Sequence, residues 1–210
     1  MSGLPKIELL SGWDCYDWRN ARTILEHGHP AEWNDVVEVL GSFKLLHSHL
    51  AKRGGRKSPI SDAIDSSLYA RGWCERKFET AILVDGNRSD SPTHKVDCFK
   101  GKIALEVEWN NKDPFYDRDL NNFRLLYELR VADLGIVVTR SLSLMDHLQR
   151  DGFQLGRDSA GTGSSTTHFG KLEPRILGGG AGGCPVLVFA MTEQLYHDDR
   201  QDGGDIVAAI

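Results

Sequence analysis

Three carboxylates in residues 94–112 are spaced so that they could hold a metal ion. Asp97 precedes Glu106 with eight residues between them, and Glu108 follows after one more residue. Residues 103–109 alternate with period two, which predicts a β-strand that carries both glutamates on one face and Ile103, Leu105, Val107 and Trp109 on the other. Two such Cα atoms lie about 6.6 Å apart, so the glutamates can share an ion, or hold two ions with Asp97 as the third ligand.

Oxygen ligands of this kind select hard cations, so Mg²⁺ is the first expectation and Mn²⁺ the second. One ion lowers the pKa of a bound water so that it can attack phosphorus, and a second ion stabilises the leaving 3′ oxygen. The three carboxylates therefore indicate phosphodiester hydrolysis. The alternative is that Glu106 and Glu108 line the water-facing side of an antiparallel sheet, and spacing alone favours this alternative.

Composition limits the classes of protein to which the chain can belong. With 210 residues, residues 1–210 are expected to form a single domain with a polar tail from residue 197. The chain has no signal-peptide pattern and no apolar run of about 20 residues, which predicts a soluble, cytoplasmic protein without a membrane partner. Four cysteines without a CxxC pair fit a reducing compartment better than a disulfide framework or a thiolate zinc site.

The net charge of −5 argues against a polyanionic partner only weakly, because binding depends on where the positive charge lies. Four cations gather within six residues, namely Lys52, Arg53, Arg56 and Lys57. They could hold the phosphates of a nucleic acid. A solvated basic loop is the alternative, and composition alone favours it.

Apolar periodicity predicts an α/β fold with a mixed central sheet flanked by helices. Strands are expected at residues 6–10, 78–84, 103–109, 134–139 and 185–191. Helices are expected at residues 19–26, 31–50, 58–71, 118–131 and 142–149. Residues 86–93 are expected to form a polar loop, and residues 152–183 a long glycine-rich loop region.

Other candidate sites have weaker support. His27 and His29, like His47 and His49, are two residues apart, which places them on different faces of a helix and argues against zinc binding. The glycines of residues 178–183 lack the Lys-Ser/Thr of a phosphate-binding loop and precede a strand, which predicts no nucleotide cofactor.

The wider order of motifs resembles the BglII, BstYI and BamHI type of restriction endonuclease. Asp97-x8-Glu106-Val107-Glu108 is preceded by KSPISDAIDSSLYARGW and followed by DLGIVVTRSLSL and GGCPVLVFAM. HGHPAEWNDVVEVL is similar, with looser spacing, to the family's N-terminal helix entry. The resemblance covers residues 20–191 and implies a restriction-endonuclease-like mixed sheet of the PD-(D/E)xK superfold.

The resemblance implies that Asp97 and Glu106 are metal ligands. Glu108 occupies the third position, where most nucleases of the superfold have a lysine, so it acts either as general base or as a further metal contact. Some relatives contribute another acidic residue from the Ser-Pro helix. Asp62 and Asp65 both remain candidates for that residue.

Two segments could read bases in the major groove, where arginine and asparagine are the commonest readers. Asn110, Asn111 and Lys112 leave the catalytic strand where relatives place a groove-facing lysine. Residues 157–168 match the position of the family's recognition loop and contribute Arg157, Ser164, Ser165, Thr166 and Thr167. In this context the four cations of residues 52–57 would hold phosphates, which position a duplex without reading it.

The sequence thus predicts a type II restriction endonuclease, which hydrolyses double-stranded DNA with Mg²⁺ to leave 5′ phosphates. Homodimer symmetry would match a palindromic site; relatives read sites with a GATC centre. The dimer could form through residues 31–50 or residues 118–131. A less specific repair or recombination nuclease and a non-catalytic DNA-binding domain are the alternatives.

Overall fold

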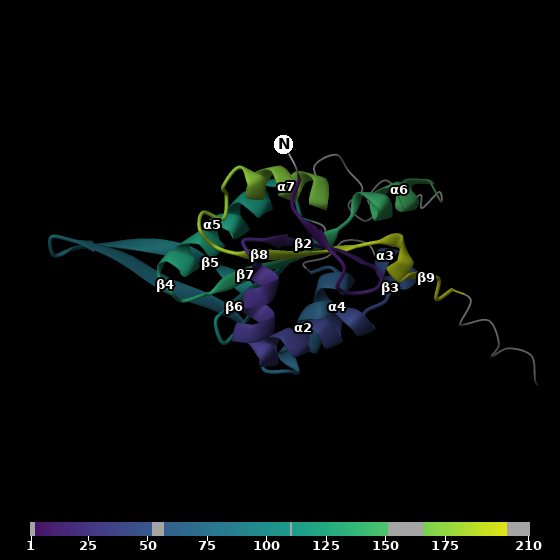
Figure 1. Cartoon of the computed structure of the whole chain (residues 1–210), viewed down its shortest axis with the longest axis horizontal. Coiled ribbons are helices and arrows are strands. Elements are labelled where there is room, and N and C mark those ends of the chain that lie inside the picture. Colours follow the sequence, from purple (N-terminus) through teal and green to yellow (C-terminus); the bar gives the residue numbers. More distant parts are fainter. Residues whose placement is uncertain (1–2, 52–56, 110, 151–165, 201–210) are drawn as a thin grey trace, which may run out of the picture.

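A seven-stranded mixed sheet forms the centre of the molecule, in the order β1-β2-β8-β7-β6-β5-β4 (Figure 1). The computed structural model describes residues 3–51, 57–109, 111–150 and 166–200. Strands β6, β7 and β8 run parallel, and the other neighbours pair antiparallel. The strands of this sheet are β1 (Lys6–Ile7), β2 (Trp13–Trp18), β4 (Cys74–Val84), β5 (Asn87–Lys100), β6 (Ile103–Val107), β7 (Leu134–Arg140) and β8 (Val186–Met191).

Helices cover both faces of the sheet, so the expected α/β architecture is confirmed (Figure 1). On one face lie α2 (Pro30–Ser42) and α4 (Pro59–Tyr69), and on the other lie α5 (Pro114–Glu128) and α7 (Phe169–Leu177). The remaining elements are α1 (Ala21–Thr23), the π-helix η1 (Ile24–Gly28), β3 (Leu45–Leu46), α3 (His47–Ala51), α6 (Leu142–Arg150), η2 (Glu193–Leu195) and β9 (Tyr196–His197). None of the described helices is long and apolar enough to cross a membrane.

The alternation predicted for residues 103–109 is confirmed. Ile103, Leu105, Val107 and Trp109 belong to the core beneath α2 and α4, whereas Ala104 belongs to the core beneath α5 and α7. Strand β7 is buried along its whole length, as its continuous apolar run predicts for a strand with neighbours on both faces. Helix α4 begins at Pro59 after Ser58, whose hydroxyl accepts a hydrogen bond from the Ser61 N–H, as expected of an N-cap.

The polar loop predicted for residues 86–93 is wrong. These residues lie almost wholly within β5, which pairs with β4 from Val84 and Asn87 onward to form a long hairpin that projects from the body (Figure 1). Asp85 and Gly86 make the turn with φ of 49° and 80°. Asp-Gly is the dipeptide that favours two residues of positive φ between paired strands, and this signal could have found the hairpin.

Two further element predictions need correction, and one strand was not predicted. Trp13–Trp18 is a strand paired with β8, although no element is predicted for these residues. The helix predicted for residues 31–50 ends at Ser42, because the extended Phe43 leads into β3, which pairs with β9. The predicted loop region of residues 152–183 contains α7, where Phe169, Leu172 and Ile176 pack on the sheet despite Pro174; residues 151–165 lie outside the described part.

Gly135 permits the close approach of α5 to β7. A Cβ built on Gly135 would lie 2.2 Å from the Phe123 ring, and Phe123 is fully buried. We expect Gly135→Ala to lower the free energy of unfolding by about 1–3 kcal/mol through overpacking, measured by urea denaturation. Gly28→Ala is the control, because a Cβ at Gly28 meets nothing within 4 Å. Equal effects of the two substitutions would contradict this packing argument.

Candidate active site

The antiparallel pairing of β5 with β6 brings two of the predicted carboxylates together. Cys98 pairs with Leu105, so one step further the same register sets Asp97 opposite Glu106. The Asp97 N–H donates to Glu106 Oε2 over 3.4 Å, and the Val107 N–H donates to Asp97 Oδ2 over 3.4 Å. Two carboxylates nine residues apart in the sequence are thus cross-strand neighbours.

Glu108 lies one residue beyond the end of β6, yet its N–H still donates to the Val138 carbonyl over 2.8 Å. Asn111 Nδ2 donates to Glu108 Oε1 over 3.0 Å. The side chains of Glu106 and Glu108 are each 1% exposed. The alternative in which both glutamates line a water-facing sheet is therefore wrong.

Helix α5 adds a carboxylate and a cation that the sequence motif does not contain. Asp119 is 1% exposed, and Arg118 Nη2 lies 2.7 Å from Asp119 Oδ1 and 3.7 Å from Glu108 Oε1. The Arg118 guanidinium also stacks over the Phe115 ring at 4.4 Å. Asp119 shares the buried side of α5 with Tyr116 and Phe123. The sequence signal that could have identified Asp119 is a charged residue at a core-facing position of a predicted helix.

Burial of these carboxylates raises their pKa values, because the charged form loses hydration. The pKa of Glu106 is raised well above its ordinary value by burial first, and then by the charges of Asp119 and Asp97. Burial and the Asp119 charge raise the pKa of Glu108 to about 9. The pKa of Asp119 is also raised by burial, although Glu108 and Arg118 oppose this shift. The carboxylate cluster is therefore more stable when it binds a cation or when its carboxyl groups retain protons.

The donor chemistry of the cluster fits a divalent cation. Within the described ranges, no three His, Cys, Asp or Glu side chains are arranged as a coordination shell. Glu106 Oε1, Glu108 Oε2 and Asp119 Oδ2 are nevertheless buried, and no donor in the described ranges hydrogen-bonds to them. Buried carboxylate oxygens of this kind are suitable ligands for a hard ion. The residues therefore fit a metal by charge and atom type, without a preformed shell.

Arg118 is expected to stabilise the metal-free site by compensating buried negative charge. We expect Arg118→Met to lower the free energy of unfolding by about 3 kcal/mol, because it leaves the Asp119 charge unpaired. Urea denaturation at pH 8 in EDTA measures the loss, and Asp119→Asn in the same chain should recover most of it. Arg124→Met is the control, because Arg124 is exposed on the same helix. Equal losses at the two arginines would contradict a compensating role.

Helix α4 places one of its two candidate aspartates in the interior. Asp65 is fully buried, whereas the Asp62 side chain is 65% exposed. Lys57 Nζ lies 2.7 Å from Asp65 Oδ2, and the Cys98 thiol donates to Asp65 Oδ1 over 3.3 Å. Burial and the charge of Asp97 raise the pKa of Asp65, against the effect of Lys57. Of the two candidates, Asp65 is the one beside the strand that carries Asp97.

The predicted DNA contacts have mixed outcomes in the described residues. Lys112 is exposed, whereas Asn111 is engaged with Glu108. Thr166 is 6% exposed and Thr167 is fully buried, which contradicts the expectation that their hydroxyls face DNA. Both instead pack against the segment that leaves β6. The remaining predicted contacts lie outside the described residues: Lys52, Arg53, Arg56, Asn110, Arg157, Ser164 and Ser165.

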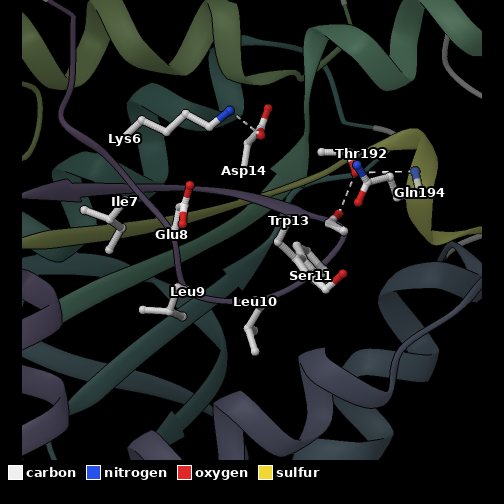
Figure 2. Close-up of a pocket in the computed structure, with 11 residues that line it drawn as sticks. Lys6, Ile7, Glu8, Leu9, Leu10, Ser11, Trp13, Asp14, Thr192 and Gln194 are labelled. Carbon is white, nitrogen blue, oxygen red and sulfur yellow. Dashed lines mark hydrogen bonds and ion pairs between the residues drawn. The ribbon is translucent and has the colours of Figure 1, made fainter.

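A surface pocket beside β1 and β2 lies apart from these carboxylates (Figure 2). Lys6 and Asp14 form an ion pair of 2.6 Å at its rim, and the Thr192 hydroxyl donates to the Gly12 carbonyl over 2.8 Å. Asp97, Glu106 and Glu108 do not line it.

Comparison with known proteins adds one family match. A family model described as restriction endonuclease BglII/BglIII matches residues 13–191, which is most of the chain. No match was found among curated proteins. The matched residues include β2 through β8 and every carboxylate described above.

Proposed function

The chain belongs to the BglII/BglIII restriction endonuclease family, and from this premise we propose that Asp97, Glu106 and Glu108 cut DNA with Mg²⁺ in a homodimer. Membership makes the protein a type II site-specific deoxyribonuclease that acts on double-stranded DNA. Enzymes of this family generally depend on a divalent metal. The proposal concerns the identity of the metal, the residues that bind it and the oligomeric state of the protein.

The contact between Asp97 and Glu106 across β5 and β6 carries the proposal. In it, these two carboxylates bind Mg²⁺, for which Mn²⁺ can substitute. A bound ion would lower the pKa of the attacking water and stabilise the leaving 3′ oxygen, so that 5′ phosphates remain. Asn111 orients the Glu108 carboxyl through its hydrogen bond. Asp65 is the further acidic residue that α4 contributes at the same edge.

Glu108 has two possible roles in this mechanism. As a further metal contact, Glu108 would hold the ion in its ionised form, because a nearby positive charge lowers the pKa of a carboxyl. As a general base, Glu108 would have to be ionised in the metal-loaded enzyme. The positive charge of the ion would favour this ionised form. The buried position beside Asp119 supports either role.

Lys57 is the described cation that the proposal assigns to the DNA backbone. The Lys57 ammonium is held by Asp65 while its side chain remains 41% exposed. Lys52, Arg53 and Arg56 extend this phosphate-holding group in the sequence. Base reading is proposed for Asn110, Asn111, the exposed Lys112 and residues 157–165.

A homodimer with one site for each DNA strand would match a palindromic target. A GATC centre is the proposed target, from the family resemblance. Helices α2 and α5, which contain most of residues 31–50 and 118–131, are the candidate interface elements. Residues 1–210 are proposed to act as a single domain.

Digestion of plasmid DNA tests the proposal directly. Purified protein is incubated with plasmid in Mg²⁺, in Mn²⁺ or in EDTA, and the ends are then sequenced. Discrete fragments that require the metal and share a palindromic end sequence are the expected result. A smear would instead favour a less specific repair nuclease. Uncut DNA that is shifted in a gel would favour a binding domain and overturn the assignment of the site.

A further inference from the structure

Arg140 is a cation enclosed in the protein without a carboxylate partner in the described part of the chain. It ends β7 and is fully buried. Its Nη2 donates to the Trp109 carbonyl over 2.6 Å, and its Nε donates to the Thr167 carbonyl over 3.2 Å. The guanidinium lies 4.7 Å from the centre of the Trp109 ring. Burial of the Arg140 guanidinium without a carboxylate partner costs folding free energy. We therefore expect Arg140 to have a role that an apolar residue could not perform.

The two carbonyls that Arg140 holds belong to different segments of the chain. Trp109 leads into residues 110–112, which leave the catalytic strand, whereas Thr167 precedes α7. The Thr167 N–H donates to the Asn111 carbonyl over 3.1 Å, and Lys112 forms an antiparallel bridge with Thr166. Arg140 therefore joins these segments at the point where they already pair with each other.

The same junction contacts the catalytic glutamate twice. The Thr167 hydroxyl lies 3.4 Å from the carbonyls of both Glu108 and Trp109. Asn111, whose carbonyl accepts from Thr167, donates its side-chain amide to the Glu108 carboxyl. A change in the position of residues 111–112 would therefore move Glu108 by two routes. One is the contact of Thr167 with the Glu108 backbone, and the other is the hydrogen bond from the Asn111 amide to the Glu108 carboxyl.

We propose that Arg140 and Thr167 form a clamp that couples contact of residues 111–112 with DNA to the placement of the Glu108 carboxyl. Exposed Lys112 meets the duplex, and the buried clamp transmits its position to the active site. The correct base sequence then controls the cleavage step in addition to binding. Both clamp residues act as positioning residues, because both are fully buried. This inference rests on the proposed roles of Glu108 and Lys112.

Thr167→Val tests the clamp with a change that keeps the side-chain volume and removes the hydroxyl. The probes are a duplex carrying the site found by sequencing the plasmid ends, and a duplex with one base pair changed. Single-turnover cleavage in Mg²⁺ and binding in Ca²⁺ are measured for both. We expect the ratio of correct to altered cleavage rates to fall about tenfold, while binding of the correct duplex changes by less than about threefold. Thr167→Ser should restore the ratio.

Thr192→Val is the matched control, because Thr192 is also a buried threonine that donates to a backbone carbonyl, but beside β1 and β2 (Figure 2). It should lower the melting temperature without changing the rate ratio. If Thr167→Val lowers the melting temperature similarly and leaves the ratio unchanged, the clamp is only structural and the inference fails. Arg140→Met should shift the ratio in the same direction as Thr167→Val.

Failure of the clamp is distinguishable from failure of the proposed active site. Glu106→Gln is measured on the same two duplexes. If Glu106→Gln abolishes cleavage and Thr167→Val leaves the rate ratio unchanged, the clamp is ruled out and the active-site assignment stands. Retained cleavage in Glu106→Gln removes the active-site assignment, and the clamp with it.

Discussion

Glu106→Gln is expected to lower the rate of DNA cleavage by at least about 1,000-fold, equivalent to about 4 kcal/mol of transition-state stabilisation. The amide has nearly the same shape as the carboxyl but cannot carry the negative charge that binds a divalent cation. Glu106 is 1% exposed and contacts Asp97 across the sheet, so few other oxygens can replace it. Single-turnover cleavage of the target duplex in Mg²⁺ measures the loss.

The substitution should leave the folded protein intact. Circular dichroism, the elution volume in gel filtration and DNA binding in Ca²⁺ should match the unmodified protein, because the buried site loses a repelled charge and gains no volume. Glu75→Gln is the control: Glu75 lies in β4 of the same sheet and makes an exposed ion pair with Lys95. Glu106→Ala should also abolish cleavage while retaining the proposed dimer. Cleavage at full rate in either Glu106 variant would remove this residue from the mechanism.

Without a divalent ion, the free energy of unfolding is expected to fall by at least about 3 kcal/mol between pH 5.5 and pH 8. The pKa of Glu108 is raised to about 9 in the folded chain, against about 4.3 when unfolded. The folded state therefore retains a proton that the unfolded state releases. The resulting stability is complete below pH 4.3 and is lost as the pH rises toward 9. The raised pKa values of Glu106 and Asp119 act in the same direction.

Urea denaturation in EDTA at the two pH values measures this loss, at about 1.4 kcal/mol per pH unit for each proton retained. Glu108→Gln should reduce the slope, because the amide does not titrate. Ca²⁺ at pH 8 should restore stability, since a ligand that binds only the folded state stabilises it. Equal stability at pH 5.5 and pH 8 in EDTA would show that the carboxylates are hydrated and ionised in the folded protein.

Local sequence patterns predicted the elements that carry the motif. The alternation of residues 103–109 specified which face of β6 bears Glu106, because successive side chains in a strand point to opposite faces. The apolar run of β7 and the Ser-Pro start of α4 were also predicted correctly. The error at residues 43–50 arises because the short parallel pair of β3 with β9 is stabilised by a partner distant in the sequence, which no local period records. The error at residues 86–93 arises because these strand residues are polar, although Asp85 and Gly86 mark the hairpin turn.

The sequence by itself determined the family, the central strand and the spacing of Asp97, Glu106 and Glu108. These follow from local periodicity and from the order of motifs along one chain. Only the tertiary structure decided that Glu106 and Glu108 are buried, that Asp65 rather than Asp62 faces the interior, and that Asp119 and Arg118 join the cluster. It also turned Thr167 inward onto Arg140. The reason is physical: packing α5 and α7 on the sheet sets the burial and charge of each carboxylate, and no spacing in the sequence specifies that packing.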